Sequence, residues 1–586
     1  MIDFSCNFLL PIQYNTHFNT PKNIIDNLEI LELQNKDLSS NDISSNLSSL
    51  NILLNPQTNI EKLILNNWSQ YYTNDITFLN ETQELTSTLF DSSSSTFNSF
   101  IYSNKEANIM LDTFNELKSE TNFKSKYFYI DVKFFEKLNE NASAMQAVCV
   151  YNMASPMITL ITPIIFLILP FFLLKLQSIP ISISQYFQIL KKLLSNHALG
   201  RLATQFGSVD WDKRVYLLFS FGFYLLQIYQ NILSCYRFFT NMSKIHNYLQ
   251  ITSNYIEQTI QTIEQFEKEC SRFKTYNDFT QTLQQHKNIL LHFGKELKTI
   301  SPWKLSLFKA AQIGKVMQQF YLLHSNEEFQ SSIAYTLFFH SYISNILEIK
   351  NKFDYKHINK CSFYSNNKSY PKFKNAYYPP LFDKHHVKDS YKLNKNIIVT
   401  GPNASGKTTF LKTSMINILF SQQFGFGFYE EAYFKPYKYL HCYLNIPDTS
   451  ARDSLFQAEA RTCKEILDSI NISNKEDDHF CIFDELYSGT NPYEAVASAF
   501  AFLYYLSSQT NVKFMLTTHF LDLCDYLKKH KNIKNMNMVT FEKENRIIYT
   551  YKVKQGISRV QGGIKVLRDL DYPDYIIKMA YKILNK

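Results

Sequence analysis

Residues 401–408 carry the residue types and spacing that phosphate binding requires. They read GPNASGKT and satisfy the pattern G-x-x-x-x-G-K-[ST]. In such a loop the glycines let the backbone turn tightly, so that its N–H groups surround phosphate oxygens. The lysine reaches the β- and γ-phosphates and the hydroxyl holds Mg²⁺. The sequence therefore predicts a nucleotide site formed by Gly401, Pro402, Asn403, Ala404, Ser405, Gly406, Lys407, Thr408 and Thr409.

The segments on either side of this loop must position it. Residues 396–400 form a short apolar run typical of a buried strand, and residues 409–420 have the spacing of a helix. A helix that begins at the loop adds partial positive charge at its N-terminus, which stabilises a bound phosphate. This order of strand, loop and helix favours a P-loop nucleotide-binding domain over a chance match.

A pair of carboxylates follows a second apolar run. Residues 479–483 read HFCIF and predict a buried strand that delivers Asp484 and Glu485 at its end. Asp484 is expected to organise Mg²⁺, directly or through water, together with Thr408. Glu485 is expected to polarise the attacking water as a general base. Hydrolysis of a nucleoside triphosphate is the chemistry that these residues predict.

Three motifs together resemble the ATPase domain of the MutS DNA mismatch repair family, a relative of the ABC-type ATPases. They are the phosphate loop, DELYSGT at 484–490 and TTHF at 517–520. The resemblance covers residues 375–586 and includes the segment 448–459. It implies that the nucleotide is ATP and that the helices within 555–584 stabilise a dimer, either a homodimer or a heterodimer with a MutS-like partner.

The resemblance also implies roles for single residues. Ser454 is expected to approach the γ-phosphate bound by the partner subunit, and its alternative role is a helix N-cap. His519 is expected to sense the γ-phosphate, and its alternative role is that of a satisfied histidine at a strand end. Asn403 is expected to contact phosphate or the attacking water. The expected catalytic residues are then Glu485, Lys407 and His519. The expected metal ligands are Thr408 and Asp484, and Ser454 is the residue expected to act across the dimer.

The sequence departs from the family pattern after the paired carboxylates. The family's Gly-Arg-Gly-Thr-Ser is replaced by YSGTN at 487–491. The missing arginine is expected to alter communication across the dimer but not to remove hydrolysis. The family's N-terminal mismatch-recognition domain is not expected, because the sequence around Phe134, Phe135 and Glu136 resembles a helix and not the strand that carries the family's aromatic wedge.

Composition and length limit the number of domains and the classes of protein to which this chain can belong. The chain has 586 residues, 45% hydrophobic and 19% charged, so it can bury large cores and is expected to contain several domains. The net charge of +8 permits contact with nucleic acid or anionic lipid without requiring either. Its nine cysteines lack metal-binding spacing, and the N-terminus lacks the features of a secretory signal. We therefore expect an intracellular protein in a reducing compartment.

The expected fold is mixed. The N-terminal two-thirds is expected to be mainly α-helical, with lever and core helices, and to be followed by an α/β P-loop NTPase domain of ABC/MutS type. The predicted domains are a first part of the helical core, an apolar hairpin, long helices of the second part of the core, and the ATPase domain with C-terminal dimerisation helices. Their bounds are 1–150, 151–238, 239–355 and 356–586.

Two apolar segments, residues 153–174 and 215–236, contain no formal charge. Each is long enough to cross a hydrocarbon core of about 30 Å as a helix. Three prolines in the first segment favour a membrane helix over a soluble one. Basic residues in the connection 175–214 oppose a crossing, because the connection would lie opposite the cytosolic ATPase domain. A transmembrane pair in place of the family's DNA clamp is one interpretation, and a re-entrant or buried hairpin is the other.

The sequence predicts a MutS-like ATPase that dimerises and couples ATP turnover to DNA binding in mismatch repair or recombination. The alternative is a membrane-anchored mechanical ATPase or scaffold without mismatch recognition. An ABC transporter subunit is a third class, but it requires a Leu-Ser-Gly-Gly signature and a larger membrane domain, and the sequence contains neither.

Overall fold

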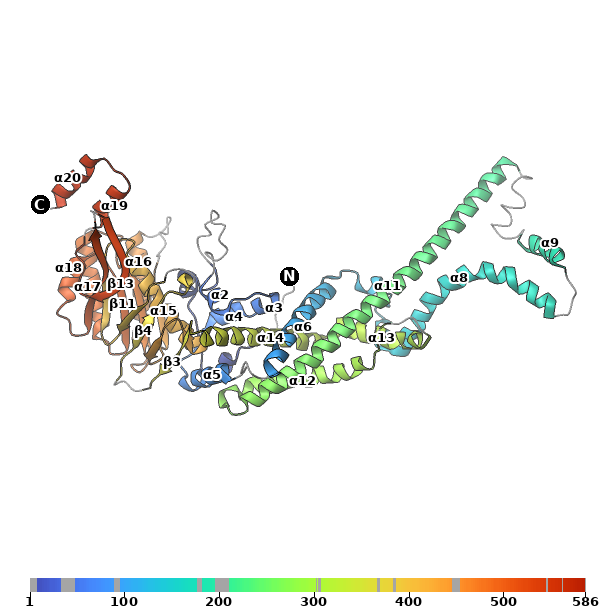
Figure 1. Cartoon of the computed structure of the whole chain (residues 1–586), viewed down its shortest axis with the longest axis horizontal. Coiled ribbons are helices and arrows are strands. Elements are labelled where there is room, and N and C mark those ends of the chain that lie inside the picture. Colours follow the sequence, from blue (N-terminus) through green and yellow to red (C-terminus); the bar gives the residue numbers. More distant parts are fainter. Residues whose placement is uncertain are drawn as a thin grey trace. The chain divides into compact units, whose positions relative to one another are not determined.

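The computed structural model describes residues 8–32, 48–88, 95–176, 182–194, 210–301, 303, 307–365, 369–382, 386–444, 454–543, 546–560 and 562–584. These residues form two compact units (Figure 1). The first unit contains residues 105–261 and 286–334. The second contains the described residues of 8–104, together with 262–285 and 335–584.

The regular elements in the described part of the first unit are all helices, and residues 127–135 between two of them are not helical. Its elements are α7 (Phe123–Lys126), the 3₁₀ helix η3 (Glu136–Glu140), α8 (Ala142–Leu176), α9 (Ile183–Leu194), α13 (Leu307–Ser325) and parts of α6 (Ser95–Ser119), α11 (Trp211–Cys270), α12 (Asn277–Lys298) and α14 (Glu327–Asp354). α13 packs against α8, where the Gly314 N–H donates to Gln146 Oε1 at 2.7 Å. A Cβ at Gly314 would lie 2.2 Å from the carbonyl oxygen of Ala142, so only glycine permits this approach.

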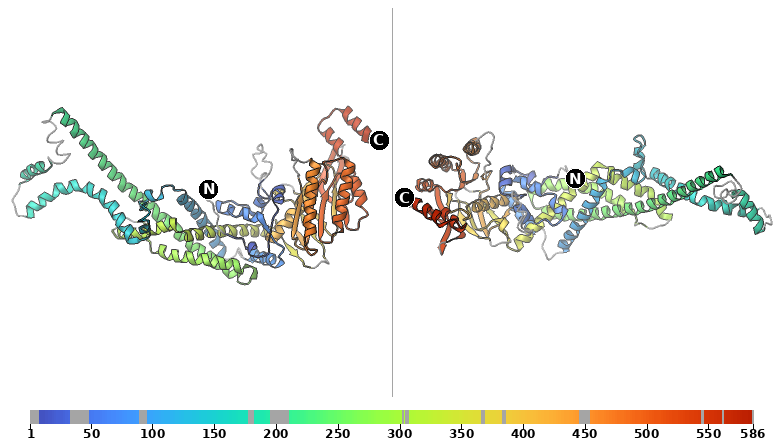
Figure 2. Two further views of the ribbon diagram at one scale, coloured as in Figure 1. Left: turned by 180° about the vertical axis from the view of Figure 1, so that it is seen from behind. Right: turned by 90° about the horizontal axis from the view of Figure 1, so that it is seen from above.

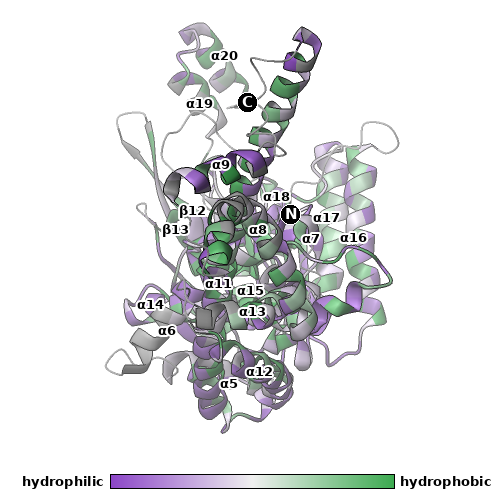
Figure 3. Cartoon of the chain, turned by 90° about the vertical axis from the view of Figure 1, so that its right-hand side faces the viewer, coloured by the Kyte–Doolittle hydropathy of each residue, from purple (hydrophilic) through white to green (hydrophobic). Residues whose placement is uncertain are grey.

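Most of α8 and the N-terminal part of α11 form a two-helix arm, defined here as residues 150–176 and 211–239 (Figure 2). One contact between its helices is polar: Asn231 Nδ2 donates to Thr159 Oγ1 at 2.6 Å. Hydrophobic residues are frequent along both helices (Figure 3). Many of their large side chains are exposed, among them Ile158 at 61% and Phe219 at 66%.

The predicted transmembrane pair is wrong. In the part of the chain that the structure describes, no helix combines the length and the apolar character needed to cross a membrane. The sequence interpretation relied on the length of the two segments, on their lack of charge and on their Ile, Leu and Phe content, and it gave little weight to the polar residues and prolines among them. Residues 153–174 include serine, threonine and proline, and residues 215–236 include Gln227, Gln230 and Asn231. The arm is not a buried packing hairpin either, because so many of its large side chains are exposed.

The second unit contains the α/β part that the sequence predicted, built around a six-stranded sheet. The strand order is β13-β12-β6-β11-β10-β9. Pairs from β9 to β12 are parallel, and β13 is antiparallel to β12. The strands are β6 (Asn396–Thr400), β9 (Tyr439–Tyr443), β10 (His479–Asp484), β11 (Val512–Thr517), β12 (Ile533–Lys543) and β13 (Arg546–Gln555).

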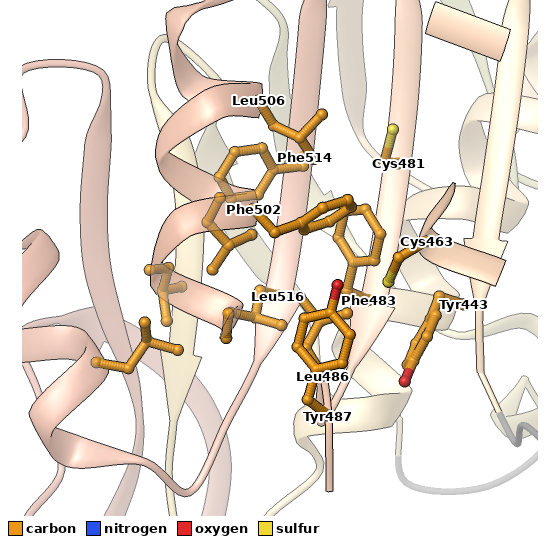
Figure 4. Packing of buried hydrophobic residues seen from close by; sticks show 14 of the residues in the cluster. Tyr443, Cys463, Cys481, Phe483, Leu486, Tyr487, Phe502, Leu506, Phe514 and Leu516 are labelled. Atoms are coloured by element: carbon orange, nitrogen blue, oxygen red, sulfur yellow. The ribbon is translucent and has the colours of Figure 1, made fainter. Parts of the chain in front are cut away.

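Helices α16 (Leu455–Ile472), α17 (Pro492–Ser508) and α18 (Leu521–Leu527) pack against one face of this sheet. The core between them is aromatic and aliphatic, with Phe483 and Phe514 on the strands and Phe502 on α17 (Figure 4). Phe483 and Phe502 meet edge to face, with ring centroids 5.5 Å apart. Burial of these rings holds the ends of β10 and β11, where the predicted catalytic residues lie.

A second sheet of five strands has the order β5-β4-β8-β3-β7. Helix α15 (Lys407–Phe424) contacts strands of both sheets. The strands are β3 (Asn359–Phe363), β4 (Lys372–Ala376), β5 (Asp389–Lys392), β7 (Phe426–Gly427) and β8 (Glu431–Phe434). The remaining elements of this unit are η1 (Pro11–Tyr14), β1 (Phe18–Asn19), α1 (Lys22–Asn27), α2 (Ser49–Leu54), α3 (Asn59–Lys62), α4 (Leu65–Gln70), β2 (Tyr71–Tyr72), α5 (Ile76–Thr88), η4 (Lys274–Tyr276), η5 (Pro379–Leu381), α19 (Gly563–Asp569) and α20 (Asp574–Leu584).

The C-terminal half of α15 is joined to the N-terminal segment of the chain. Gln422 Nε2 donates to the carbonyl oxygens of Thr73 and Tyr437 at 2.8 and 2.7 Å. Its Oε1 accepts from the Tyr437 N–H at 3.1 Å. Gln423 Nε2 donates in the same way to the carbonyl oxygen of Trp68 at 2.8 Å. These buried amides satisfy backbone groups that no water could reach.

Replacing Gln422 with alanine is expected to lower the free energy of unfolding by about 2 kcal/mol, because three buried backbone groups lose their partner. The midpoint of urea unfolding measures the loss. Gln284→Ala is the matched control, since Gln284 lies on a helix of the same unit and is exposed. Equal midpoints for the two variants would show that the Gln422 hydrogen bonds contribute nothing.

Two histidines meet between β9 and β10. His441 Nε2 lies 3.0 Å from His479 Nδ1, and Ser473 Oγ lies 2.7 Å from His479 Nε2. Burial lowers the pKa of His479 to about 4 and that of His441 to about 3. For His441 the neighbouring His479 acts in the same direction. For His479, Asp477 raises the pKa and Lys438 lowers it.

This pair predicts that the second unit loses stability in acid. An unfolded histidine has a pKa of about 6.5, so the unfolded state takes up protons first as the pH falls. The stabilisation is complete above pH 6.5 and is lost as the pH falls from about 6.5 toward 4. Urea midpoints measured between pH 8 and pH 5 should fall less steeply in His479→Gln than in the unchanged protein. The same slope in both proteins would contradict the assignment.

Candidate nucleotide site

The phosphate loop follows β6 and ends at the start of α15, the order of elements that the sequence predicted. Gly406 has φ of +93°, which a side chain would strain, and a Cβ there would lie 3.2 Å from Tyr551 Cδ1. Ala404 also has a positive φ, +60°. A turn with two residues of this kind brings successive backbone N–H groups to one side, as anion binding requires.

A cavity of about 600 Å³ lies over the loop and the first turn of α15. Met538 and Tyr551, from the β12–β13 hairpin, line it, and Glu485 reaches it from the end of β10. Tyr378 and Asp389 come from outside the motifs. Loop residues that line it are Asn403, Ala404, Ser405, Gly406, Lys407, Thr408 and Thr409, whereas Gly401 and Pro402 do not.

The loop residues fit a bound phosphate. Lys407 is 6% exposed, and its Nζ donates to the carbonyl oxygens of Gly401 and Pro402 at 3.1 and 3.2 Å. Burial lowers the pKa of Lys407, and the nearby Glu485 and Asp484 act in the opposite direction. Ser405 Oγ is buried and has no hydrogen-bond partner in the described structure. A phosphate would supply an acceptor to this hydroxyl and a counter-charge to the ammonium.

Two oxygen ligands suited to Mg²⁺ lie together beside the loop. Thr408 Oγ1 donates to Asp484 Oδ2 at 2.9 Å, and Thr517 Oγ1 donates to Asp484 Oδ1. Hydroxyl and carboxylate oxygens are the donors that Mg²⁺ prefers, alongside water and phosphate. Thr408 and Asp484 would therefore hold the ion, and Thr517 would orient the carboxylate. When bound, Mg²⁺ neutralises charge on the phosphates.

Glu485 and His519 lie at the ends of neighbouring parallel strands, as the sequence predicted. His519 Nε2 is 3.1 Å from Glu485 Oε1. This hydrogen bond is the largest cause that lowers the pKa of Glu485, and burial acts against it. The carboxylate is therefore ionised at neutral pH, which a general base requires.

The same nitrogen of His519 also lies 3.0 Å from Lys407 Nζ. An ammonium donates only, so His519 must accept from Lys407 when Nε2 is unprotonated and can donate to Glu485 only when Nε2 carries a proton. The two contacts therefore compete for one atom. A phosphate that draws Lys407 away would leave His519 free to donate to Glu485 or to the phosphate itself.

Ser454 lies outside the cavity, at the N-terminus of α16. It is exposed, and its Oγ accepts from the Gln457 N–H at 3.3 Å in a capping box. The N-cap role is thus visible in one chain, and the role across a dimer stays a prediction. Glu494 is exposed and accepts from Thr490 Oγ1 at 2.9 Å, which is a local contact.

Sequence reasoning missed the cavity residues outside the motifs, Met538, Tyr551 and Asp389. Tyr551 has a φ of +56°, but no pattern in its neighbourhood predicts this. Glu459, on α16, ends the segment 448–459 that resembles the family, but the sequence predicts no role for it. It is 2% exposed and accepts hydrogen bonds from the loop that follows Glu485.

Comparison with known proteins agrees with the resemblance. Residues 397–586 match the family model of MutS domain V. The DNA mismatch repair protein MutS of Persephonella marina is 32% identical over 217 residues, which are 36% of this chain and 24% of that protein. MutS of Bacteroides fragilis is 31% identical over 193 residues, and MutS of Listeria monocytogenes 26% over 191, each 32% of this chain and 22% of the relative. The chain thus matches about a quarter of the length of these relatives.

Proposed function

Because its C-terminal region is similar to MutS domain V, we propose that this chain is a MutS-like ATPase that binds ATP with Mg²⁺ and hydrolyses it. The observation that carries this proposal is a cluster of side chains at the phosphate loop. Lys407 and Glu485 line the cavity there and both lie within hydrogen-bond distance of His519, and Thr408, which also lines the cavity, donates to Asp484. These residues come from the start of α15 and from the ends of β10 and β11. A purely structural ion-pair network would not require the glycine loop beneath them.

In this mechanism the protein contributes charge and orientation. Lys407 and the loop N–H groups stabilise negative charge on the phosphates, and Glu485 positions and deprotonates the attacking water. His519 holds Glu485 in its ionised form. Asn403, which lines the cavity, is placed to contact phosphate or water.

We propose further that the chain acts as a dimer. The C-terminal helix α20 exposes an apolar ridge formed by Ile576, Met579 and Ile583. A cavity of about 970 Å³ beside α17 and α18 is lined mostly by apolar side chains, among them Val496 and Phe500, and also by His519 and Asp522. Both surfaces are suited to contacts with a second subunit, and Ser454 would complete the site across that interface.

We propose that this ATPase binds DNA, because the relatives are named DNA mismatch repair proteins. The alternative is a mechanical ATPase or scaffold that does not bind DNA. The exposed apolar side chains of the arm favour this alternative, because DNA binding relies on cationic surfaces that neutralise phosphates.

Three measurements on the purified full chain test these proposals. We expect Mg²⁺-dependent ATP hydrolysis, a dimer in sedimentation with ATP, and DNA affinity that falls steeply with salt. No hydrolysis would overturn the ATPase proposal. A monomer with and without ATP would overturn the dimer. Hydrolysis without salt-dependent DNA binding would support the scaffold alternative.

A further inference from the structure

The loop that follows Glu485 has an unusual backbone. Glu485 has a φ of +53° and Tyr487 a φ of +58°, although neither is glycine. Left-handed conformations of this kind cost roughly 1 kcal/mol or more each and persist only where surrounding contacts enforce them. The position of the Glu485 carboxylate therefore depends on whatever holds residues 486–489 in place.

The carboxylate of Glu459, on α16, makes three hydrogen bonds to this loop. Its Oε1 accepts from the Ser488 N–H at 3.1 Å and from Ser488 Oγ at 2.9 Å. Its Oε2 accepts from the Gly489 N–H at 3.2 Å. Glu459 is 2% exposed, so water cannot replace these contacts. Buried carboxylates that accept several N–H bonds fix the backbone they contact.

Packing joins the same loop to the same helix. Tyr487 is 7% exposed, and its ring centroid lies 5.6 Å from that of Phe456 on α16. Figure 4 shows Leu486 and Tyr487 in the cluster that also contains Phe483. A Cβ at Gly489 would lie 2.8 Å from both Leu455 Cγ and the Phe456 nitrogen, so the loop is in direct contact with the first turn of α16.

We propose that Glu459 is a positioning residue for hydrolysis. By holding the loop at 487–489 against α16, it enforces the left-handed backbone that directs Glu485 into the nucleotide cavity. The inference rests on the proposed ATPase function and adds a residue that does not touch the nucleotide. It also means that the contacts of Glu459 connect α16, which begins after Ser454, to the loop that positions the general base Glu485.

Replacing Glu459 with glutamine tests this proposal. The side-chain amide of glutamine would place its own N–H donors against the N–H groups of the loop, which need an acceptor. We expect kcat for ATP hydrolysis to fall by on the order of 10- to 100-fold, with the ATP dissociation constant changed less than about twofold. Glu465→Gln is the matched control, since Glu465 is exposed on the same helix. Its kcat should not change.

A double variant separates positioning from general weakening of the domain. With Glu485→Gln already in place, adding Glu459→Gln should lower the residual single-turnover rate by less than about twofold, because Glu459 acts through Glu485. A further loss as large as in the single variant would overturn the proposal. So would an unchanged kcat in Glu459→Gln.

Ser488→Ala gives a second route if Glu459→Gln does not fold. It removes only one of the three donors, and we expect a loss in kcat of about threefold with unchanged ATP affinity. An unchanged kcat in this variant would overturn the proposal. If the unchanged protein and Glu465→Gln both fail to hydrolyse ATP, the proposed function itself is wrong; if both hydrolyse it and Glu459→Gln does so equally well, the positioning role alone is wrong.

Discussion

Replacing Glu485 with glutamine is expected to lower kcat for ATP hydrolysis by about 10²- to 10⁴-fold, the usual contribution of a general base. The amide has the same shape but cannot take a proton from water. ATP affinity should remain within about twofold, because the phosphates are held by the loop and Lys407. Single-turnover hydrolysis and equilibrium binding of a fluorescent ATP analogue measure the two quantities.

The matched control for this variant is Glu494→Gln. Glu494 is exposed and follows the same strand; among the described residues its carboxylate accepts from Thr490 Oγ1, and its backbone N–H donates to Asn491 Oδ1. Its replacement should leave both quantities unchanged. If Glu485→Gln retains turnover within tenfold of the unchanged protein, Glu485 is not the base. Because its pKa is lowered, Glu485 should stay ionised throughout the neutral range, so the rate should not fall through its protonation near pH 6.

Replacing Lys407 with methionine is expected to weaken ATP binding by about 10- to 100-fold. The variant loses charge-assisted hydrogen bonds to phosphate, each worth about 1.5–3 kcal/mol, and every 1.4 kcal/mol is a factor of ten in affinity. Methionine preserves most of the length of the side chain and its packing. Isothermal titration with ATP and Mg²⁺ measures the affinity.

Thermal unfolding gives an independent measure of the same variant. Lys407 is buried and its pKa is lowered, so the ammonium is partly desolvated in the free protein. Without nucleotide, Lys407→Met should therefore unfold at the same or a higher temperature, while the stabilisation by saturating ATP should be largely lost. Lys412→Met, on the same helix and only partly buried, should behave like the unchanged protein. Unchanged ATP affinity in Lys407→Met would contradict the assignment.

The parts of the site that sequence could predict are those in which chemistry and local structure coincide. The loop at 401–408 requires glycine for its backbone and lysine for its charge, so the pattern is visible without any neighbour. β10 and β11 are apolar runs that end in Asp484 and near His519, and parallel strands bring such ends to one edge of a sheet. The N-cap alternative for Ser454 was visible because a capping box is local.

The remaining features depend on contacts between distant residues. Strands β3 (Asn359–Phe363) and β4 (Lys372–Ala376) of the five-stranded sheet are not predicted by the sequence. Each is only five residues long and rich in polar residues, so a period of two cannot be distinguished from chance over so short a run. Met538 and Tyr551 reach the cavity only because β12 pairs with β6.

The amide contacts at the end of α15 have a consequence for the order in which the chain can fold. Gln422 and Thr73 are 349 residues apart in sequence, and Gln423 and Trp68 are 355 apart. During synthesis on the ribosome, the segment that contains Trp68 and Thr73 is made first. Its partner, the end of α15, is made only after most of the chain. At about 5–20 residues per second, that delay is on the order of tens of seconds. Buried aromatic residues such as Trp68 would be exposed throughout it, so chaperones that shield nascent chains should bind here first.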